Sequence, residues 1–133
     1  MRLADIHRDG WALLDAEERH IDAPEKFEIP ARNLREQLQP GDFAKLLFVI
    51  ATEDGHSEER EPVERMWVVV RKRHDGTYVG RLDNEPSGIG KNDEFWAGVE
   101  VPFEPRHVIA IQPGDDASRA LAAKPPVRDW PLD

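Results

Sequence analysis

The stretch that most constrains the fold of this chain is a β-hairpin predicted over residues 64–86. Strand-favouring Val, Trp and Tyr residues stand on both sides of an Asp75-Gly76 dipeptide. Asp-Gly is typical of a two-residue type I′ turn, because both central residues of that turn have positive φ, which Gly adopts freely and Asp tolerates. Counting outward from the turn predicts the pairs His74 with Thr77, Arg73 with Tyr78, Arg71 with Gly80, Val69 with Leu82, and Trp67 with Asn84.

This register divides the side chains of the hairpin between two faces, because successive residues of a strand point to opposite sides. The face that we expect to join the core holds Trp67, Val69, Tyr78 and Leu82. The opposite face holds Lys72, Val79, Arg81, Asp83 and Glu85. Gly80 falls on the expected core face, where a glycine within a strand marks a bend, a bulge or a close approach of the backbone.

Three further stretches predict strands. Residues 43–51 are apolar on both faces except at Lys45, which is typical of a central strand. A Pro40-Gly41 turn leads into this stretch. Residues 99–103 and 108–111 predict two more strands, and Pro102 favours an edge position for the first of them.

Helical spacing of apolar residues predicts short helices over 10–20, 31–38 and 116–123. Strands joined by turns, with helices before the first strand, predict an α+β fold: a small, strongly bent antiparallel sheet or partly open barrel of about five strands, with short N-terminal helices and a short C-terminal helix. A length of 133 residues suits one domain over 1–133, with a helical N-terminal part (1–38), a β core (40–112) and a C-terminal tail (113–133).

Composition restricts the class of partner. With 18 Lys and Arg against 27 Asp and Glu, the net charge of -9 repels phosphate groups, so nucleic acid and anionic membrane are not expected as main partners. The chain has no cysteine, which excludes disulfides, a thiol nucleophile and a cysteine-based zinc site. No apolar run has the length of a membrane span and the N-terminus lacks a signal peptide, so we expect a soluble cytoplasmic protein.

Four segments in order resemble the small bacterial DUF2314 family. They are Pro40 to Phe48, with a Gly-Asp step and a lysine-bearing strand; Glu64 to Val70, with Glu-x-x-Trp-Val; Tyr78 to Pro86, with Gly-x-x-x-Asn-x-Pro; and His107 to Ile111, a closing strand. The resemblance covers residues 38–112. The family is one of unknown function, so the resemblance implies a fold and leaves the activity open.

No motif for catalysis, metal or cofactor binding stands out in the sequence. The five histidines lack zinc-ligand spacing, and no serine lies in a Gly-x-Ser-x-Gly elbow, so neither a metal nor a cofactor is expected. Glu64 is the single candidate for a catalytic residue, because burial of its carboxyl beside Trp67 would raise its pKa and suit it to act as a general acid. The alternative is that Glu64 pairs with a basic residue of a neighbouring strand.

The candidate binding residues are five, at the end of the predicted sheet: Trp67, Tyr78, Asn84, Pro86 and Trp96. Aromatic rings would supply contact area in a small groove there, and the Asn84 amide would orient a ligand. The alternative is that the aromatic residues belong to the core and that Asn84 caps the turn that follows.

The leading functional hypothesis is a non-enzymatic module that binds another protein, of a regulatory or toxin-neutralising type. Residues 53–64 carry six carboxylates against one arginine, and an acidic surface speeds association with a basic partner. Two alternatives stay open: a small hydrolase or isomerase that uses Glu64 with Asn84 as polariser, and a nucleic-acid-binding barrel that uses Arg71-Lys72-Arg73 with Tyr78. The oligomeric state is not predicted.

Overall fold

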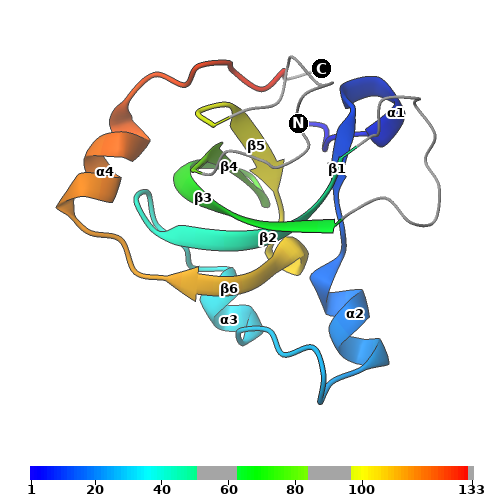
Figure 1. Cartoon of the computed structure of the whole chain (residues 1–133). Helices are drawn as coiled ribbons and strands as arrows, with labels where there is room; N and C mark the ends of the chain where they lie inside the picture. The colour runs from blue at the N-terminus through cyan, green and yellow to red at the C-terminus, as the bar shows by residue number, and fades with distance from the viewer. Residues whose placement is uncertain (51–62, 84–96, 132–133) are drawn as a thin grey trace.

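The computed structural model describes residues 1–50, 63–83 and 97–131, which form a curled antiparallel sheet flanked by short helices (Figure 1). The strands are β1 (Trp11–Leu13), β2 (Phe43–Ile50), β3 (Val63–His74), β4 (Thr77–Leu82), β5 (Glu100–Phe103) and β6 (Val108–Gln112). The helices are α1 (Ile6–Asp9), α2 (Ala16–Asp22), α3 (Arg32–Arg35), the 3-10 helix η2 (Pro105–His107) and α4 (Asp116–Ala123). The predicted α+β class with a strongly bent antiparallel sheet is confirmed.

The central strand of the sheet is β2, as its apolar sequence predicted. The strand order is β1-β2-β3-β4-β5, and β6 pairs with β2 outside this path. Strand β3 pairs along one edge of β2, over residues 43–49. The other edge is shared, because β6 pairs with residues 43–46 and β1 with residues 48–50. Strand β5 is the last in the path, in agreement with the edge position that Pro102 predicted.

The hairpin of β3 and β4 closes where the sequence predicted. His74 pairs with Thr77 and Arg73 with Tyr78, so the turn and its first two pairs are confirmed. Asp75 has a φ of 55°, but Gly76 does not lie in the left-handed region. The expectation of positive φ at both central residues, and hence of a type I′ turn, is therefore wrong for Gly76.

Further from the turn, the predicted register is wrong by one residue. A β-bulge between Val70 and Lys72 makes Arg71 an extra residue of β3. The observed pairs are Lys72 with Val79, Val70 with Gly80 and Val68 with Leu82, in place of Arg71 with Gly80 and Val69 with Leu82. The predicted partner of Trp67, Asn84, lies outside the described residues, and the Trp67 carbonyl accepts a hydrogen bond from Asp83 N–H at 3.0 Å.

The bulge re-aims the side chain of Arg71, as bulges commonly do. The Arg71 guanidinium forms an ion pair with the buried carboxylate of Glu100. It also donates to the carbonyls of Ala122 and Lys124, at 3.1 Å each. Arg71 thereby ties the bulge to β5 and to the end of α4.

Because the bulge inverts the alternation of side chains in β3, Trp67 and Val69 lie on the face opposite the main core cluster, although Val69 is fully buried there. The core instead takes Met66, Val68 and Val70 from β3, together with Tyr78 and Leu82 from β4. The prediction for β4 is thus correct, while that for β3 is displaced by one residue. The core cluster is completed by Trp11, Leu38, Ala44, Leu46, Phe48, Ile50, Val99, Val101, Phe103 and Val108.

Gly80 lies at a close approach of backbone to side chains, as expected. A Cβ atom at this position would lie 2.9 Å from Val68 Cγ2 and 3.2 Å from Phe103 Cε1. The first separation is shorter than carbon atoms tolerate without a shift. Glycine therefore lets β4 pack directly beneath these two side chains.

The N-terminal helices differ from the prediction. Residues 10–20 do not form one helix, because Trp11–Leu13 pair with β2 as β1 and α2 begins only at Ala16. The side chain of Trp11 is buried against Phe48, with ring centroids 5.8 Å apart, and this burial overrides the helical spacing. The Asp15 side chain then caps α2 by accepting a hydrogen bond from Glu18 N–H at 2.9 Å.

The other two predicted helices have different outcomes. The helix expected over 31–38 is reduced to the single turn α3, while α4 spans Asp116–Ala123 as predicted and packs against β3. In the described part of the chain, no helix has both the length and the apolar composition required to cross a membrane.

Candidate binding cleft

Among the predicted site residues that the structure describes, Trp67 and Tyr78 lie on opposite faces of the sheet. Tyr78 is fully buried in the core, whereas Trp67 is half-buried on the opposite face of the sheet, beside Phe43 and Lys45. Glu64 is half-buried near the start of β3, paired across the sheet with Phe48. The other three predicted residues, Asn84, Pro86 and Trp96, lie outside the described residues, as do residues 53–62 of the acidic segment.

Tyr78 anchors the segment around α3 to the sheet. Its hydroxyl donates to the Arg35 carbonyl at 2.8 Å and accepts from Leu38 N–H at 3.2 Å. Its ring stacks on Phe103 with centroids 5.1 Å apart, and the Arg73 guanidinium carbon lies 5.0 Å from the ring centroid. Tyr78 is thus a core residue that positions a helix and the end of the hairpin.

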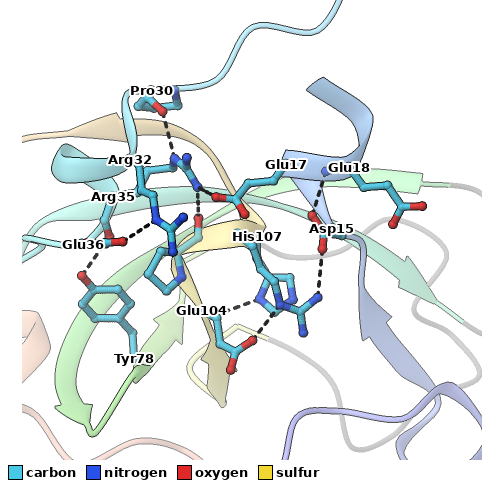
Figure 2. A network of polar contacts seen from close by, with 12 residues as sticks. Asp15, Glu17, Glu18, Pro30, Arg32, Arg35, Glu36, Tyr78, Glu104 and His107 are labelled. Carbon is cyan, nitrogen blue, oxygen red and sulfur yellow. Dashed lines mark hydrogen bonds and ion pairs between the residues drawn. The ribbon is translucent and has the colours of Figure 1, made fainter. Parts of the chain in front are cut away.

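Beside Tyr78, the buried guanidinium of Arg35 joins three separate segments (Figure 2). It donates to the Glu17 carboxylate of α2 at 2.8 Å. It also donates to the carbonyl of Pro30 at 2.9 Å and to that of Pro105 in η2 at 2.8 Å. An arginine with several fixed acceptors tolerates burial, because each of these hydrogen bonds replaces one that the guanidinium would otherwise make to water.

His107 ends η2 and is also buried. Its Nδ1 accepts a hydrogen bond from Glu104 N–H at 2.9 Å, so Nδ1 carries no proton in this arrangement. Burial, followed by the nearby Arg106 guanidinium, lowers the pKa of the His107 imidazole to about 4, although the neighbouring carboxylates act in the opposite direction. His107 is therefore neutral near pH 7.

Arg106 links η2 to the start of α2. Its guanidinium donates to the Glu104 carboxylate at 2.7 Å and to Asp15 Oδ2 at 3.1 Å. Burial alone would raise the pKa of the Asp15 carboxyl, but hydrogen bonds from Glu18 N–H and Arg106 more than offset burial and lower that pKa. The Asp15 carboxylate is thus held in the charged form by fixed donors.

Beside these contacts lies a cleft of about 420 Å³ between α2, α3, the tip of the hairpin and η2. Its charged lining consists of Glu17, Glu36, Glu104, Arg32, Arg73 and Arg106, and the remaining lining residues are Gly76 and Pro105. Each of the three glutamates has an arginine partner, since Glu36 pairs with Arg32 at 2.6 Å and the other two pair as described above.

Arg73 differs from the other lining arginines. Its side chain is exposed at the end of β3, and within the described residues it has no carboxylate partner. Its guanidinium donates to the carbonyl of Glu36 at 2.7 Å and to that of Asp75 at 3.1 Å. These two bonds and the Tyr78 ring hold the guanidinium in place while leaving N–H donors unused.

The charged side chains of the cleft are fixed by their own ion pairs. The described residues that line it include no serine, threonine or cysteine, and their glutamates are held by arginines. Among the described residues, no group of three or more histidine, aspartate or glutamate side chains is placed to hold a metal ion. The cleft therefore offers charged hydrogen-bonding groups at fixed positions, with one arginine available to a ligand.

The contacts described above place the arginines of the basic run Arg71-Lys72-Arg73 in different parts of the molecule. Arg71 is engaged by Glu100 on one side of the molecule, Arg73 lies at the cleft, and Tyr78 is buried between the sheet and α3. These residues do not form the shared basic and aromatic face that the nucleic-acid hypothesis requires of them.

Sequence reasoning did not single out Arg35 or His107 as site residues, and it named Arg73 only within the basic run of the nucleic-acid alternative. The pairing of Arg73 with Tyr78 was the one available signal, because it placed a cation beside an aromatic ring near the turn. The contacts of Arg35 with Glu17 and Pro105 join residues far apart in the chain, and no local pattern marks them.

No protein-family model, curated protein or solved structure matches the chain, so the resemblance to the DUF2314 family stays a prediction.

Proposed function

We propose that this domain is a non-catalytic protein-binding module and that the cleft at the tip of the hairpin contacts its partner. The observation that carries the proposal is Arg73, an exposed guanidinium that the protein holds in place without a carboxylate partner among the described residues. Arginine is enriched among the residues that dominate binding energy at protein interfaces.

The way in which Arg73 is held supports this role. Two backbone carbonyls and an aromatic ring already restrict its rotamers, so a partner that binds it loses little further side-chain entropy. The unused donors match the carboxylates or backbone carbonyls of another protein. The surrounding ion pairs keep the rest of the cleft fixed, which limits the reorganisation that binding requires.

The net charge of -9 supports a partner that is basic overall. Long-range attraction would accelerate the encounter, and Arg73 would fix the orientation of the docked complex. Regulatory and toxin-neutralising proteins both work in this way, by occupying a surface of another protein. The binding should accordingly weaken as salt concentration rises.

The test uses the tagged full chain as bait in native lysate at low and high salt, with stoichiometry measured on the recovered partner. Arg73→Glu should reduce capture about tenfold or more. Lys72→Glu is the matched control, because it makes the same charge change at the adjacent exposed residue and should retain the partner. Arg73→Gln, which removes the charge without reversing it, should also weaken capture.

Thermal melts of all variants separate loss of binding from loss of folding. Recovery of no stoichiometric partner at low salt would overturn the proposed function. Equal capture by the parent and by well-folded Arg73→Glu would remove the cleft from the interface.

A further inference from the structure

A second hollow lies on the face of the sheet opposite the core cluster and shares no lining residue with the cleft. It has a volume of about 150 Å³, and Lys45 of β2, Arg65 of β3 and Ala110 of β6 contribute to its wall. Lys45 and Ala110 are direct neighbours across the β2–β6 pair. We call this hollow the basic groove.

Three cations line the basic groove: Lys26, Lys45 and Arg65. None of them forms an ion pair in the part of the chain that the structure describes. Two of the cations rest on aromatic rings instead, since Lys45 Nζ lies 5.5 Å from the centroid of Trp67 and the Arg65 guanidinium carbon lies 5.8 Å from that of Phe27. Ring contacts orient these cations without neutralising their charge.

This grouping runs against the charge of the whole molecule. The chain has 27 acidic residues against 18 basic ones, yet the charged lining of the groove is three cations and one carboxylate, Glu28. A partner surface that covers unpaired cations must remove their water, which is unfavourable unless the partner supplies a negative group. The groove therefore discriminates between surfaces that carry a carboxylate at this point and surfaces that do not.

We infer that the basic groove receives an acidic side chain of the partner protein and so fixes the register in which the partner docks. This inference rests on the proposed protein-binding function. The volume of about 150 Å³ is roughly half of the ~300 Å³ at which small-molecule pockets begin, so it suits a single side chain. The carboxylate meets Lys45 and Arg65, while Phe27, Ile109 and Ala110 contact the aliphatic part of the side chain.

Single-stranded nucleic acid is a less suitable occupant. Binding of that kind relies on aromatic rings with faces open to bases, whereas Trp67 and Phe27 each have a cation over the ring. The net charge of -9 also repels a phosphate chain beyond the groove. A lone carboxylate on a basic partner avoids both penalties.

The test titrates the isolated protein with two capped peptides, Leu-Glu-Glu-Leu and its uncharged analogue Leu-Gln-Gln-Leu, and follows the Trp67 indole N–H by NMR. The acidic peptide should shift this signal, and the analogue should bind about tenfold more weakly or not at all. Lys45→Glu combined with Arg65→Glu should weaken the acidic peptide about tenfold or more. Lys72→Glu with Lys124→Glu makes the same total charge change at exposed residues outside the groove and should leave binding unchanged.

Several results would overturn the inference: no shift with the acidic peptide at millimolar concentration, equal binding of both peptides, or equal binding by the two charge-reversed proteins. Oligo(dT) or inorganic phosphate that binds the groove as tightly as the peptide would also overturn it, since the groove would then be a general anion site. Lys45→Gln with Arg65→Gln repeats the test if the reversed variant does not fold. Because peptide titration needs no natural partner, its failure is distinguishable from failure of the capture experiment on Arg73.

Discussion

The buried imidazole of His107 should make the stability of this protein strongly dependent on pH in mildly acidic solution. The side chain is 2% exposed, and its Nδ1 accepts the hydrogen bond from Glu104 N–H. Protonation of Nδ1 would place a proton where the structure requires an acceptor, and would put a charge beside the Arg106 guanidinium. The folded state therefore resists protonation, while the unfolded chain does not.

The magnitude follows from the difference in pKa between the two states. The imidazole pKa falls from 6.5 in the unfolded chain to about 4 in the folded protein. Above pH 6.5 the imidazole is neutral in both states, so its full contribution to stability is present. As the pH falls from 6.5 towards 4, the unfolded state binds a proton that the folded state rejects, and the free energy of unfolding decreases by about 3 kcal/mol.

Urea unfolding followed by tryptophan fluorescence between about pH 7 and about pH 4 measures this loss. His107→Asn retains an acceptor near the position of Nδ1 but does not titrate, so its stability should decrease by about 3 kcal/mol less than that of the parent over this range. The absolute stability of the variant at neutral pH does not enter the comparison. His74→Asn, which replaces an exposed imidazole at the end of β3, is the matched control and should retain the pH dependence of the parent. Identical pH dependence in the parent and His107→Asn would refute the reasoning.

Substitutions at two further positions, Gly80 and Glu100, test the packing around the bulge. Gly80→Ala should lower the free energy of unfolding by about 1–3 kcal/mol because its Cβ would lie 2.9 Å from Val68, and Gly80→Val should lower it further. Gly76→Ala is the control, because no atom lies within 4 Å of its Cβ. A melting temperature of either Gly80 variant within error of the parent would contradict the close approach. Glu100→Ala should lower the free energy of unfolding, measured with urea, by about 3 kcal/mol, because it leaves the Arg71 side chain, which is 15% exposed, without its carboxylate. An unchanged urea midpoint would show that this ion pair does not stabilise the fold.

The hairpin shows where prediction from the sequence succeeds and where it stops. The Asp75-Gly76 turn and the pairs next to it depend on local backbone preferences, which the sequence displays directly. The bulge at Arg71 depends on Glu100 and on carbonyls at the end of α4, which are distant in the chain. Since side chains alternate along a strand, this single extra residue was enough to exchange the faces assigned to β3.

Short elements were predicted wrongly for a related reason. Trp11 has helical spacing with its neighbours, but burial of its ring against Phe48 makes a three-residue strand the better solution. The cleft was not predictable either, because Arg35 satisfies its buried charge with groups from α2, the α2–α3 connection and η2. Long strands and the capped helix α4, by contrast, carry their signals within their own sequence.

The shared edge of β2 has a consequence for synthesis on the ribosome. Residues 43–46 of β2 obtain their β6 partners only once the chain has grown to residues 108–112, well after the residues of β3 have been synthesised. During that interval the backbone groups along this part of β2 are open to strands of other nascent chains, because an unpaired apolar edge is a template for association. Premature termination before β6 would leave the edge open permanently, so truncated chains should be recognised by chaperones as incomplete.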